Sequence, residues 1–165
     1  MPLVPRVAPG PKTGPLPPVE VQALLESARV LRRAVESGGP ICLLRDKNLG
    51  LMCADEDSAE AALFRRAANG LGARVSHLRP LAPDIDPKVV RDTARMLGRL
   101  YDAVECQGLS RALVQAIRVD AGVPVHDAMA SLREPEALLV RDALGGSEGD
   151  IPTLTLQTLL LSTLT

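Results

Sequence analysis

The chain has 165 residues, of which 46% are hydrophobic and 24% charged, a composition that fits one globular domain and excludes disorder over most of its length. Nineteen basic and twenty acidic residues give a net charge of −1, so no overall positive field attracts nucleic acid or an anionic membrane. Only Phe64 and Tyr101 are aromatic, which requires an aliphatic core and leaves almost no surface for stacking single-stranded bases.

The cysteine pattern and the apolar segments indicate the compartment. Three cysteines without a C-x-x-C spacing (Cys42, Cys53 and Cys106) argue against a disulfide framework or a zinc ribbon and favour reduced, buried thiols. No apolar signal segment opens the chain, and the longest charge-free stretch, 151–165, is shorter than the roughly 20 residues that span a bilayer. We therefore expect a cytoplasmic protein with no membrane partner and no nucleic-acid partner.

The N-terminal part divides into an arm and a helix. Seven of the first 18 residues are proline, so residues 1–17 are predicted to form a Pro-rich flexible arm, followed by one domain over 18–165. Apolar residues then recur at helical spacing from Val21 to Val35, and Gly38-Gly39-Pro40 ends this helix.

From residue 48 onward, short apolar runs alternate with helical patterns. The predicted strands are 48–53, 73–78, 102–106 and 123–126, and the helices between them are 58–69, 87–99 and 110–121. This alternation predicts an α/β, Rossmann-like three-layer domain with a four-stranded parallel sheet flanked by helices. Two further helices are predicted at 136–144 and 152–164, separated by a Gly-rich loop at 145–149. Ligands of such sheets bind at the carboxyl ends of the strands, here after Cys53, Leu78, Cys106 and His126.

Four segments carry a resemblance to a known family. Residues 92–105 (DTARMLGRLYDAVE) resemble the DTARVLGRMYDGIE helix and strand of ornithine carbamoyltransferases. Residues 121–125 (AGVPV), 44–49 (LRDKNL) and 72–75 (GARV) resemble further strands of the same domain. Over residues 18–160 the chain resembles the carbamoyl-phosphate-binding, N-terminal domain of the aspartate/ornithine carbamoyltransferase family. The family's second, amino-acid-binding domain has no counterpart in the sequence.

The resemblance implies a phosphate loop that has lost its arginines. The family follows its first strand with Ser-Thr-Arg-Thr-Arg at a helix start, which cradles the phosphate. Aligned on Phe64, this chain has at those positions Asp57, Ser58, Ala59, Glu60 and Ala61. Two carboxylates replace a positive clamp, so a dianionic phosphate would meet like charge.

Two other parts of the implied site are also degenerate. Gln107 stands where the family has an arginine that contacts carbamoyl phosphate. The family's His-Pro-x-Gln motif corresponds to residues 151–154, in which Ile151 and Leu154 replace both side chains that orient the carbamoyl group. The resemblance therefore implies a chain without catalytic residues and without carbamoyltransferase activity. No G-x-G-x-x-G follows any strand, so we expect no cofactor, and the sequence places no metal site.

The acidic residues and the cysteines have structural explanations as well as chemical ones. Asp57 at the N-cap with Glu60 three residues later forms a capping box pattern, which we favour over a carboxylate pair for metal binding or acid–base chemistry. Cys53 and Cys106 end the first and third strands, where they are predicted to be neighbouring, inert thiols.

The histidines and the arginines of the helix 87–99 also have structural explanations. His77 and His126 are expected to be packed or hydrogen-bonded, although His126 with Asp127 at a strand end is the better candidate for a remodelled pocket. Arginines recur every four residues on the helix 87–99 and are expected to form a solvated face; they are Arg91, Arg95 and Arg99.

These observations favour an inactive carbamoyltransferase homologue of amino-acid metabolism, kept as an interaction or regulatory module. Its expected partners are further copies of itself (a trimer, by the resemblance) or a catalytic carbamoyltransferase paralogue. The leucine-rich tail at 151–165 is expected to form an uncovered apolar patch that contributes to this interface. The alternatives are a small-molecule-binding protein or divergent transferase with a pocket around Gln107, His126 and Asp127, or a remnant without a selected role.

Overall fold

A computed structural model describes residues 18–131, 134–145 and 150–165. The Pro-rich arm expected at 1–17 and most of the loop expected at 145–149 lie outside these described residues. The elements, in chain order, are α1 (Pro18–Glu36), β1 (Asn48–Met52), α2 (Ala59–Gly70), β2 (Arg74–Leu78), α3 (Pro87–Leu100), β3 (Ala103–Cys106), α4 (Arg111–Ala121), β4 (Val125–Asp127), α5 (Glu134–Ala143) and α6 (Ile151–Leu164). Each lies within a few residues of the segment that the sequence patterns predict.

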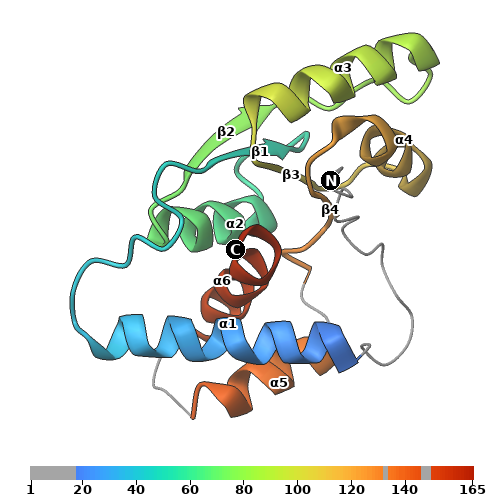
Figure 1. The fold of residues 1–165 in the computed structure, drawn as a ribbon. Helices are drawn as coiled ribbons and strands as arrows, with labels where there is room; N and C mark the ends of the chain where they lie inside the picture. Colours follow the sequence, from blue (N-terminus) through green and yellow to red (C-terminus); the bar gives the residue numbers. More distant parts are fainter. Residues whose placement is uncertain (1–17, 132–133, 146–149) are drawn as a thin grey trace, which may run out of the picture.

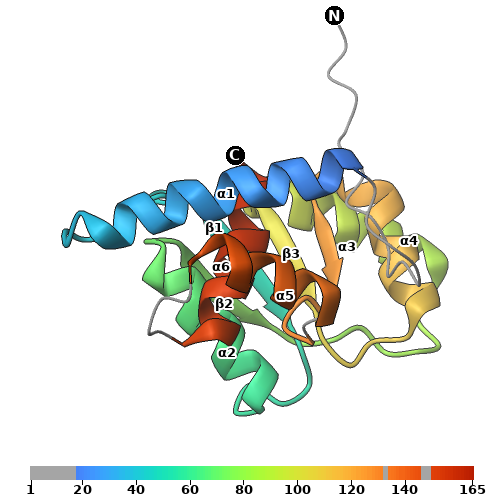
Figure 2. The same ribbon diagram turned by 90° about the horizontal axis from the view of Figure 1, so that it is seen from below.

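The strands form one parallel sheet in the order β2-β1-β3-β4. Helices α3 and α4 cover one face, and α2, α6 and α1 cover the other, with α5 packed outside α1 and α6 (Figures 1 and 2). The predicted fold class is thus confirmed. Strands β1 and β3 lie in the middle of the sheet, so their carboxyl ends lie side by side, with Met52 level with Cys106.

The core is aliphatic, as the composition predicts. Between the sheet and α2, leucines and alanines surround Phe64, which is 1% exposed. On the opposite face, Val90 and Leu97 of α3 pack with Ile117 of α4. Helices α3 and α4 approach closely at Gly98, where a Cβ atom would lie 1.7 Å from the Ala121 carbonyl oxygen.

Helix α6 confirms the predicted helix but not the predicted uncovered patch. Leu156 and Leu160 are 0% exposed and Leu161 is 2% exposed, because α2 covers one side of α6 while α1 and α5 cover another. Two buried threonines of this helix donate their hydroxyl hydrogens to backbone carbonyl oxygens one turn earlier, Thr155 to Ile151 at 2.7 Å and Thr158 to Leu154 at 2.8 Å. The tail is therefore part of the core, and the expectation that it forms an exposed interface is wrong. Among the described helices, none is both long enough and apolar enough to cross a membrane.

Candidate functional site

The start of α2, after β1, is where the resemblance implies a phosphate loop. The N-cap of this helix is Ser58, whose Oγ accepts a hydrogen bond from the Ala61 N–H at 3.1 Å. The expected cap, Asp57, is wrong by one residue: its own N–H donates to Asp55 Oδ1 at 3.0 Å, which places it in the turn before the helix. A cap of this kind contributes about 1 kcal/mol, so Ser58 and not Asp57 supplies that stability.

The surroundings of this helix start are acidic. Asp55, Glu56, Asp57 and Glu60 are all exposed around it. The guanidinium of Arg65 donates to the Glu56 carbonyl oxygen. The partial positive charge of the helix N-terminus is therefore complemented by carboxylates of the chain itself.

The two alanines of the implied loop differ in their environment. Ala59 is exposed, whereas Ala61 is 0% exposed and belongs to the core around Phe64. The resemblance pairs Ala61 with an arginine of the family motif. In this chain a guanidinium at that position would have to enter an aliphatic core, which would be costly without an ionic partner.

Gln107 connects the end of β3 to this same helix start. Its side chain is buried, and its Nε2 donates to the Glu60 carbonyl oxygen at 3.2 Å. The structure therefore brings Gln107 to the loop positions 57–61. The Oε1 atom of Gln107 has no hydrogen-bond partner.

Glu105 is a buried carboxyl group that the sequence analysis missed. It is 1% exposed, neither oxygen has a hydrogen-bond partner of good geometry, and burial raises its pKa to about 8. Backbone N–H groups of Met129 and Ala130 and the Gln107 side chain act in the opposite direction on this pKa, while the Asp127 charge raises it further. A glutamate within an otherwise apolar strand flanked by apolar neighbours was the available sequence signal.

His126 lies level with Glu105 on the adjacent strand β4. It is buried, its Nε2 has no partner, and burial together with the Arg118 charge lowers its pKa to about 4. Because successive strand residues point to opposite faces, His126 faces the same side as Glu105, and Asp127 the other side. His126 and Asp127, expected to share a pocket, are thus adjacent in the chain but not on one face.

The cysteines are partly as expected. Cys53 and Cys106 are buried free thiols at the ends of the adjacent strands β1 and β3, and burial raises both pKa values, that of Cys106 to about 12. They belong to core clusters on opposite faces of the sheet. Cys42, expected to be buried, is exposed because it lies in the connection before β1.

His77 and the arginines of α3 also match their structural interpretations. One ring nitrogen of His77, Nε2, lies 2.8 Å from the Cys53 carbonyl oxygen, and Nδ1 lies 3.3 Å from Glu56 Oε2. His77 therefore links β2 to the turn before α2. The α3 arginines are all exposed, and Arg95 pairs with Asp120 of α4 at 3.5 Å.

Ile151 and Leu154, which replace the implied carbamoyl ligands, lie in the first turn of α6. Leu154 packs against the core around Phe64 and against a second cluster formed by α1 and α5. The polar neighbour Thr153 accepts a hydrogen bond from Arg66 of α2 at 3.0 Å, and Arg66 also pairs with Asp150 at 3.1 Å. This start of α6 is held by packing and by a surface ion pair with α2.

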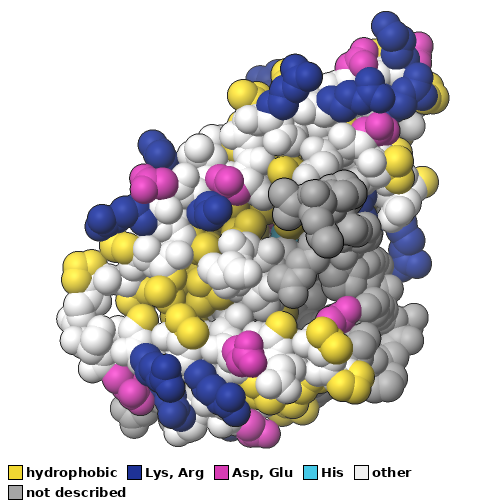
Figure 3. Space-filling model, viewed as in Figure 1, with side chains coloured by type: hydrophobic (Ala, Val, Ile, Leu, Met, Phe, Trp, Pro, Cys, Tyr) yellow, Lys and Arg dark blue, Asp and Glu magenta, His cyan; other side chains and the backbone are white. Residues whose placement is uncertain are grey.

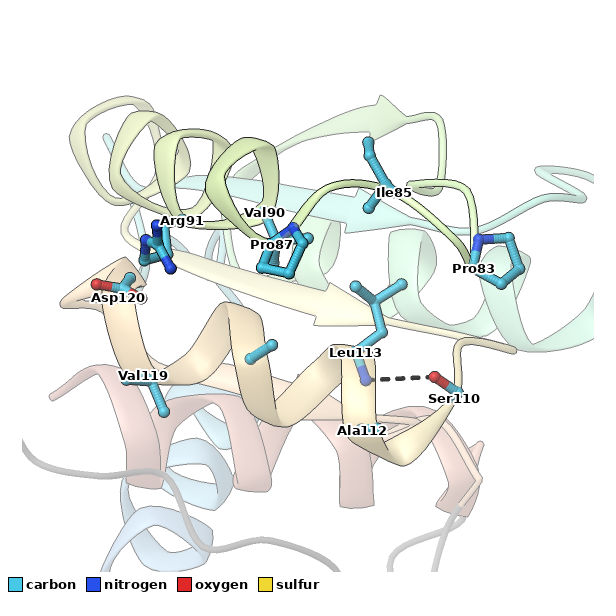
Figure 4. Close-up of a pocket in the computed structure, with 11 residues that line it drawn as sticks. Pro83, Ile85, Pro87, Val90, Arg91, Ser110, Ala112, Leu113, Val119 and Asp120 are labelled. Carbon is cyan, nitrogen blue, oxygen red and sulfur yellow. Dashed lines mark hydrogen bonds between the residues drawn. The ribbon is translucent and has the colours of Figure 1, made fainter.

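A separate hollow lies between α3 and α4, on the opposite face of the sheet (Figure 4). Its volume is about 360 Å³. Its apolar lining includes Pro83, Ile85 and Leu113, and Arg91 and Asp120 lie together at one end. Its lining comes from two helices and the loop before α3, so no local sequence pattern indicates this hollow. Within residues 18–131, 134–145 and 150–165, no three His, Cys, Asp or Glu side chains come together as a metal site.

No protein-family model matches the chain. A catabolic ornithine carbamoyltransferase from Burkholderia mallei is 37% identical over 121 residues, which are 73% of this chain and 36% of that protein. The catalytic subunit of M. jannaschii aspartate transcarbamoylase matches in fold with a TM-score of 0.57 and 22% identity, over 75% of this chain and 42% of the other. Ornithine carbamoyltransferase from Pyrococcus furiosus gives a TM-score of 0.54 and 27% identity, over 66% of this chain and 35% of the other. The chain thus spans about a third of the length of the curated relative that it matches.

Proposed function

We propose that this chain, which is homologous to ornithine and aspartate carbamoyltransferases over about three quarters of its length, is a homologue without carbamoyltransferase activity that acts as an interaction or regulatory module. The observation that carries the proposal is the start of α2, where the chain's own Ser58 caps the helix and exposed carboxylates surround it. We expect this module to act in amino-acid metabolism, in the cytoplasm.

A phosphate dianion at this helix start would lose more than it gains. It would compete with Ser58 for the Ala61 N–H and would approach the carboxylates of Asp57 and Glu60. Bidentate contacts from arginine guanidinium groups are the usual source of affinity for phosphate. Here the guanidinium of Arg65 donates to the Glu56 carbonyl oxygen instead.

Carbamoyl phosphate should therefore leave the melting temperature of this chain unchanged. At about 1 mM ligand, a site with a dissociation constant above 1 mM contributes less than about 0.5 kcal/mol, which corresponds to a shift of no more than roughly 2 °C. The measurement is a thermal-unfolding titration, with a catalytic ornithine carbamoyltransferase titrated in parallel as the positive control. A clear upward shift of this chain, saturating at micromolar ligand, would contradict the proposal.

The interaction surface that we propose is the outer side of α3. Val89, Met96 and Leu100 are 43%, 52% and 57% exposed, and their spacing of seven and four residues puts them on one side of the helix. Val119 of α4 is a further exposed apolar side chain, 72% exposed. Over α3, Figure 3 shows hydrophobic side chains among many Lys and Arg side chains. An apolar stripe rimmed by charge is typical of a protein-binding surface, and a second copy or a catalytic carbamoyltransferase is the proposed partner.

Light scattering after size-exclusion chromatography should show an oligomer of the full chain at micromolar concentration. Met96→Lys with Leu100→Lys should shift it towards the monomer, because two charges would be buried in the contact. Val30→Lys, at a side chain of α1 that is 46% exposed, is the matched control and should leave the mass unchanged. A monomeric wild-type chain that also fails to bind a catalytic carbamoyltransferase would contradict the interaction module.

A small-molecule-binding protein is the second candidate. It is supported by the unpartnered polar atoms of Gln107 and His126 near the carboxyl ends of β3 and β4. These atoms are buried, so a ligand could reach them only if the residues that lie over them moved away. A thermal-shift screen of polar metabolites separates the candidates, since a pocket binder gains stability from one of them while an interaction module does not.

A further inference from the structure

The carboxyl ends of β3 and β4 hold a cluster of buried polar atoms without a hydrogen-bond partner of good geometry. The atoms without a hydrogen-bond partner are Oε1 and Oε2 of Glu105, Oε1 of Gln107 and Nε2 of His126. All three side chains are more than nine-tenths buried. Buried polar atoms are almost always paired, so four such atoms on adjacent strand ends require an explanation.

The strand geometry places these side chains together. Glu105 and Gln107 are two residues apart at the end of β3 and therefore point to the same side of the sheet. His126 is level with Glu105 on β4 and shares that side. The cluster lies under the start of α2, where Gln107 Nε2 contacts the Glu60 carbonyl oxygen.

We propose that Glu105 is a buried proton-binding site: in the folded chain it carries a proton near neutral pH, and release of this proton opens the turn at 128–131. A neutral carboxyl group removes a charge without an ionic partner from the interior and adds an O–H donor to the cluster. The inference stands on the burial and the register of these residues and does not depend on the proposed loss of carbamoyltransferase activity.

The charged and titratable groups around Glu105 favour its neutral form. Asp127 adds a negative charge nearby, and the thiols of Cys53 and Cys106 remain protonated. The charge of Arg118 on α4 lowers the pKa values of His126 and Cys106. Its guanidinium donates to the Val125 carbonyl oxygen at 2.9 and 3.1 Å. No cation among the described residues forms an ion pair with Glu105.

Helix α2 and the turn at 128–131 lie over the cluster, and the turn is the part that can move away. Helix α2 and the strands β1 and β4 are held by regular hydrogen bonds, whereas this turn is fastened by Ala128 N–H to the Cys106 carbonyl oxygen at 2.8 Å and by Ser131 N–H to the Ala128 carbonyl oxygen at 2.9 Å. Ala128 has a φ of 53°, a left-handed conformation that costs a non-glycine residue free energy. Met129 and Ala130 lie against Glu105. Ionisation of Glu105 therefore favours a state in which this turn lifts and water reaches the carboxylate.

The pH dependence follows from two shifts of opposite sign. The folded-state pKa of Glu105 is raised to about 8, so its contribution to stability is lost as pH rises from its unfolded value towards 8. The pKa of His126 is lowered from 6.5 to about 4, so the chain gains stability across that window as pH rises. The two effects oppose each other below about pH 6.5, which leaves a net loss between about pH 6.5 and 8.

Urea unfolding of the full chain between about pH 6.5 and 8 tests the site, with Glu105→Gln as the variant. The folding equilibrium constant of the wild type should fall roughly tenfold, because unfolding releases the Glu105 proton in this pH range. Glu105→Gln cannot ionise and carries N–H donors, so its constant should stay level. Glu60→Gln makes the same chemical change at an exposed position and should keep the wild-type fall.

Two measurements on the wild type keep the test independent of how the variant folds. Infrared spectroscopy at neutral pH should show the carbonyl band of a protonated carboxyl group, and hydrogen exchange at Met129 and Ala130 should be faster at pH 8 in the wild type than in Glu105→Gln. Absence of the infrared band, or a Glu105→Gln profile that keeps the wild-type fall, would overturn the proposal. So would stabilisation of the wild type, but not of Glu105→Gln, by ammonium or divalent metal salts, since a cation would then be the occupant.

Discussion

Gly98→Ala should destabilise the chain by about 3 kcal/mol, even though alanine favours a helix by about 1 kcal/mol over glycine. Gly98 lies in α3 where α4 crosses it, and a Cβ atom there would lie 1.7 Å from the Ala121 carbonyl oxygen and 2.8 Å from its carbonyl carbon. Both are backbone atoms at the end of α4, just before the left-handed Gly122, and cannot rotate away as a side chain would. The helices would have to separate, which would disturb the packing of Leu97 and Ile117.

Urea denaturation of the two proteins measures this effect. Gly39→Ala is the matched control, because nothing lies within 4 Å of a Cβ at that position, and its unfolding free energy should stay close to that of the wild type. If Gly98→Ala were as stable as the wild type, α3 and α4 would be free to slide apart, and the close crossing would not be a requirement of the fold.

Leu160→Ala should cost about 3 kcal/mol of stability, within the range of 2 to 5 kcal/mol observed for buried leucines. The Leu160 side chain is 0% exposed and packs in the cluster that contains Phe64 and Leu156. The cost combines the lost transfer of the side chain with the cavity that remains between α6 and its neighbours.

The matched control is Leu138→Ala on α5, where the side chain is 53% exposed and the expected change is below about 0.5 kcal/mol. Equal, small effects for both variants would show that α6 is not part of the core. The tail would then be available for an interface, as the sequence pattern alone indicates.

The order and type of the elements could be predicted because they depend on local periodicity. The change from helical spacing in α1 to short apolar runs at β1 and β3 is visible in the amino-acid sequence. The alternation of helices and strands then favours a parallel sheet with crossover connections. The capping residue of α2 does not follow from local pattern alone. Asp57 and Ser58 are both good N-caps, and the choice depends on the turn in which the Asp57 N–H binds Asp55.

The candidate site was predictable only in part. Gln107 and the loop 57–61 follow adjacent strands, and the structure joins them through the Glu60 carbonyl oxygen. The pairing of His126 with Asp127 was wrong because alternation along a strand separates neighbours, and the register across strands puts Glu105 beside His126 instead. That register is a long-range property, so the apolar neighbours of Glu105 in β3 indicated its burial but not its position beside His126.

The sequence by itself determined the parallel α/β sheet, the aliphatic core and the loss of arginines from the implied phosphate loop, since each depends on residue type and near-neighbour spacing. Only the tertiary structure decided what covers each apolar or ionisable group. Leucines on several sides of α6 indicate burial or an exposed patch equally well, and the answer depends on α1, from the other end of the chain, packing beside α5 over that helix. Periodicity records which side of an element is apolar, whereas burial is set by contacts between residues far apart in the chain.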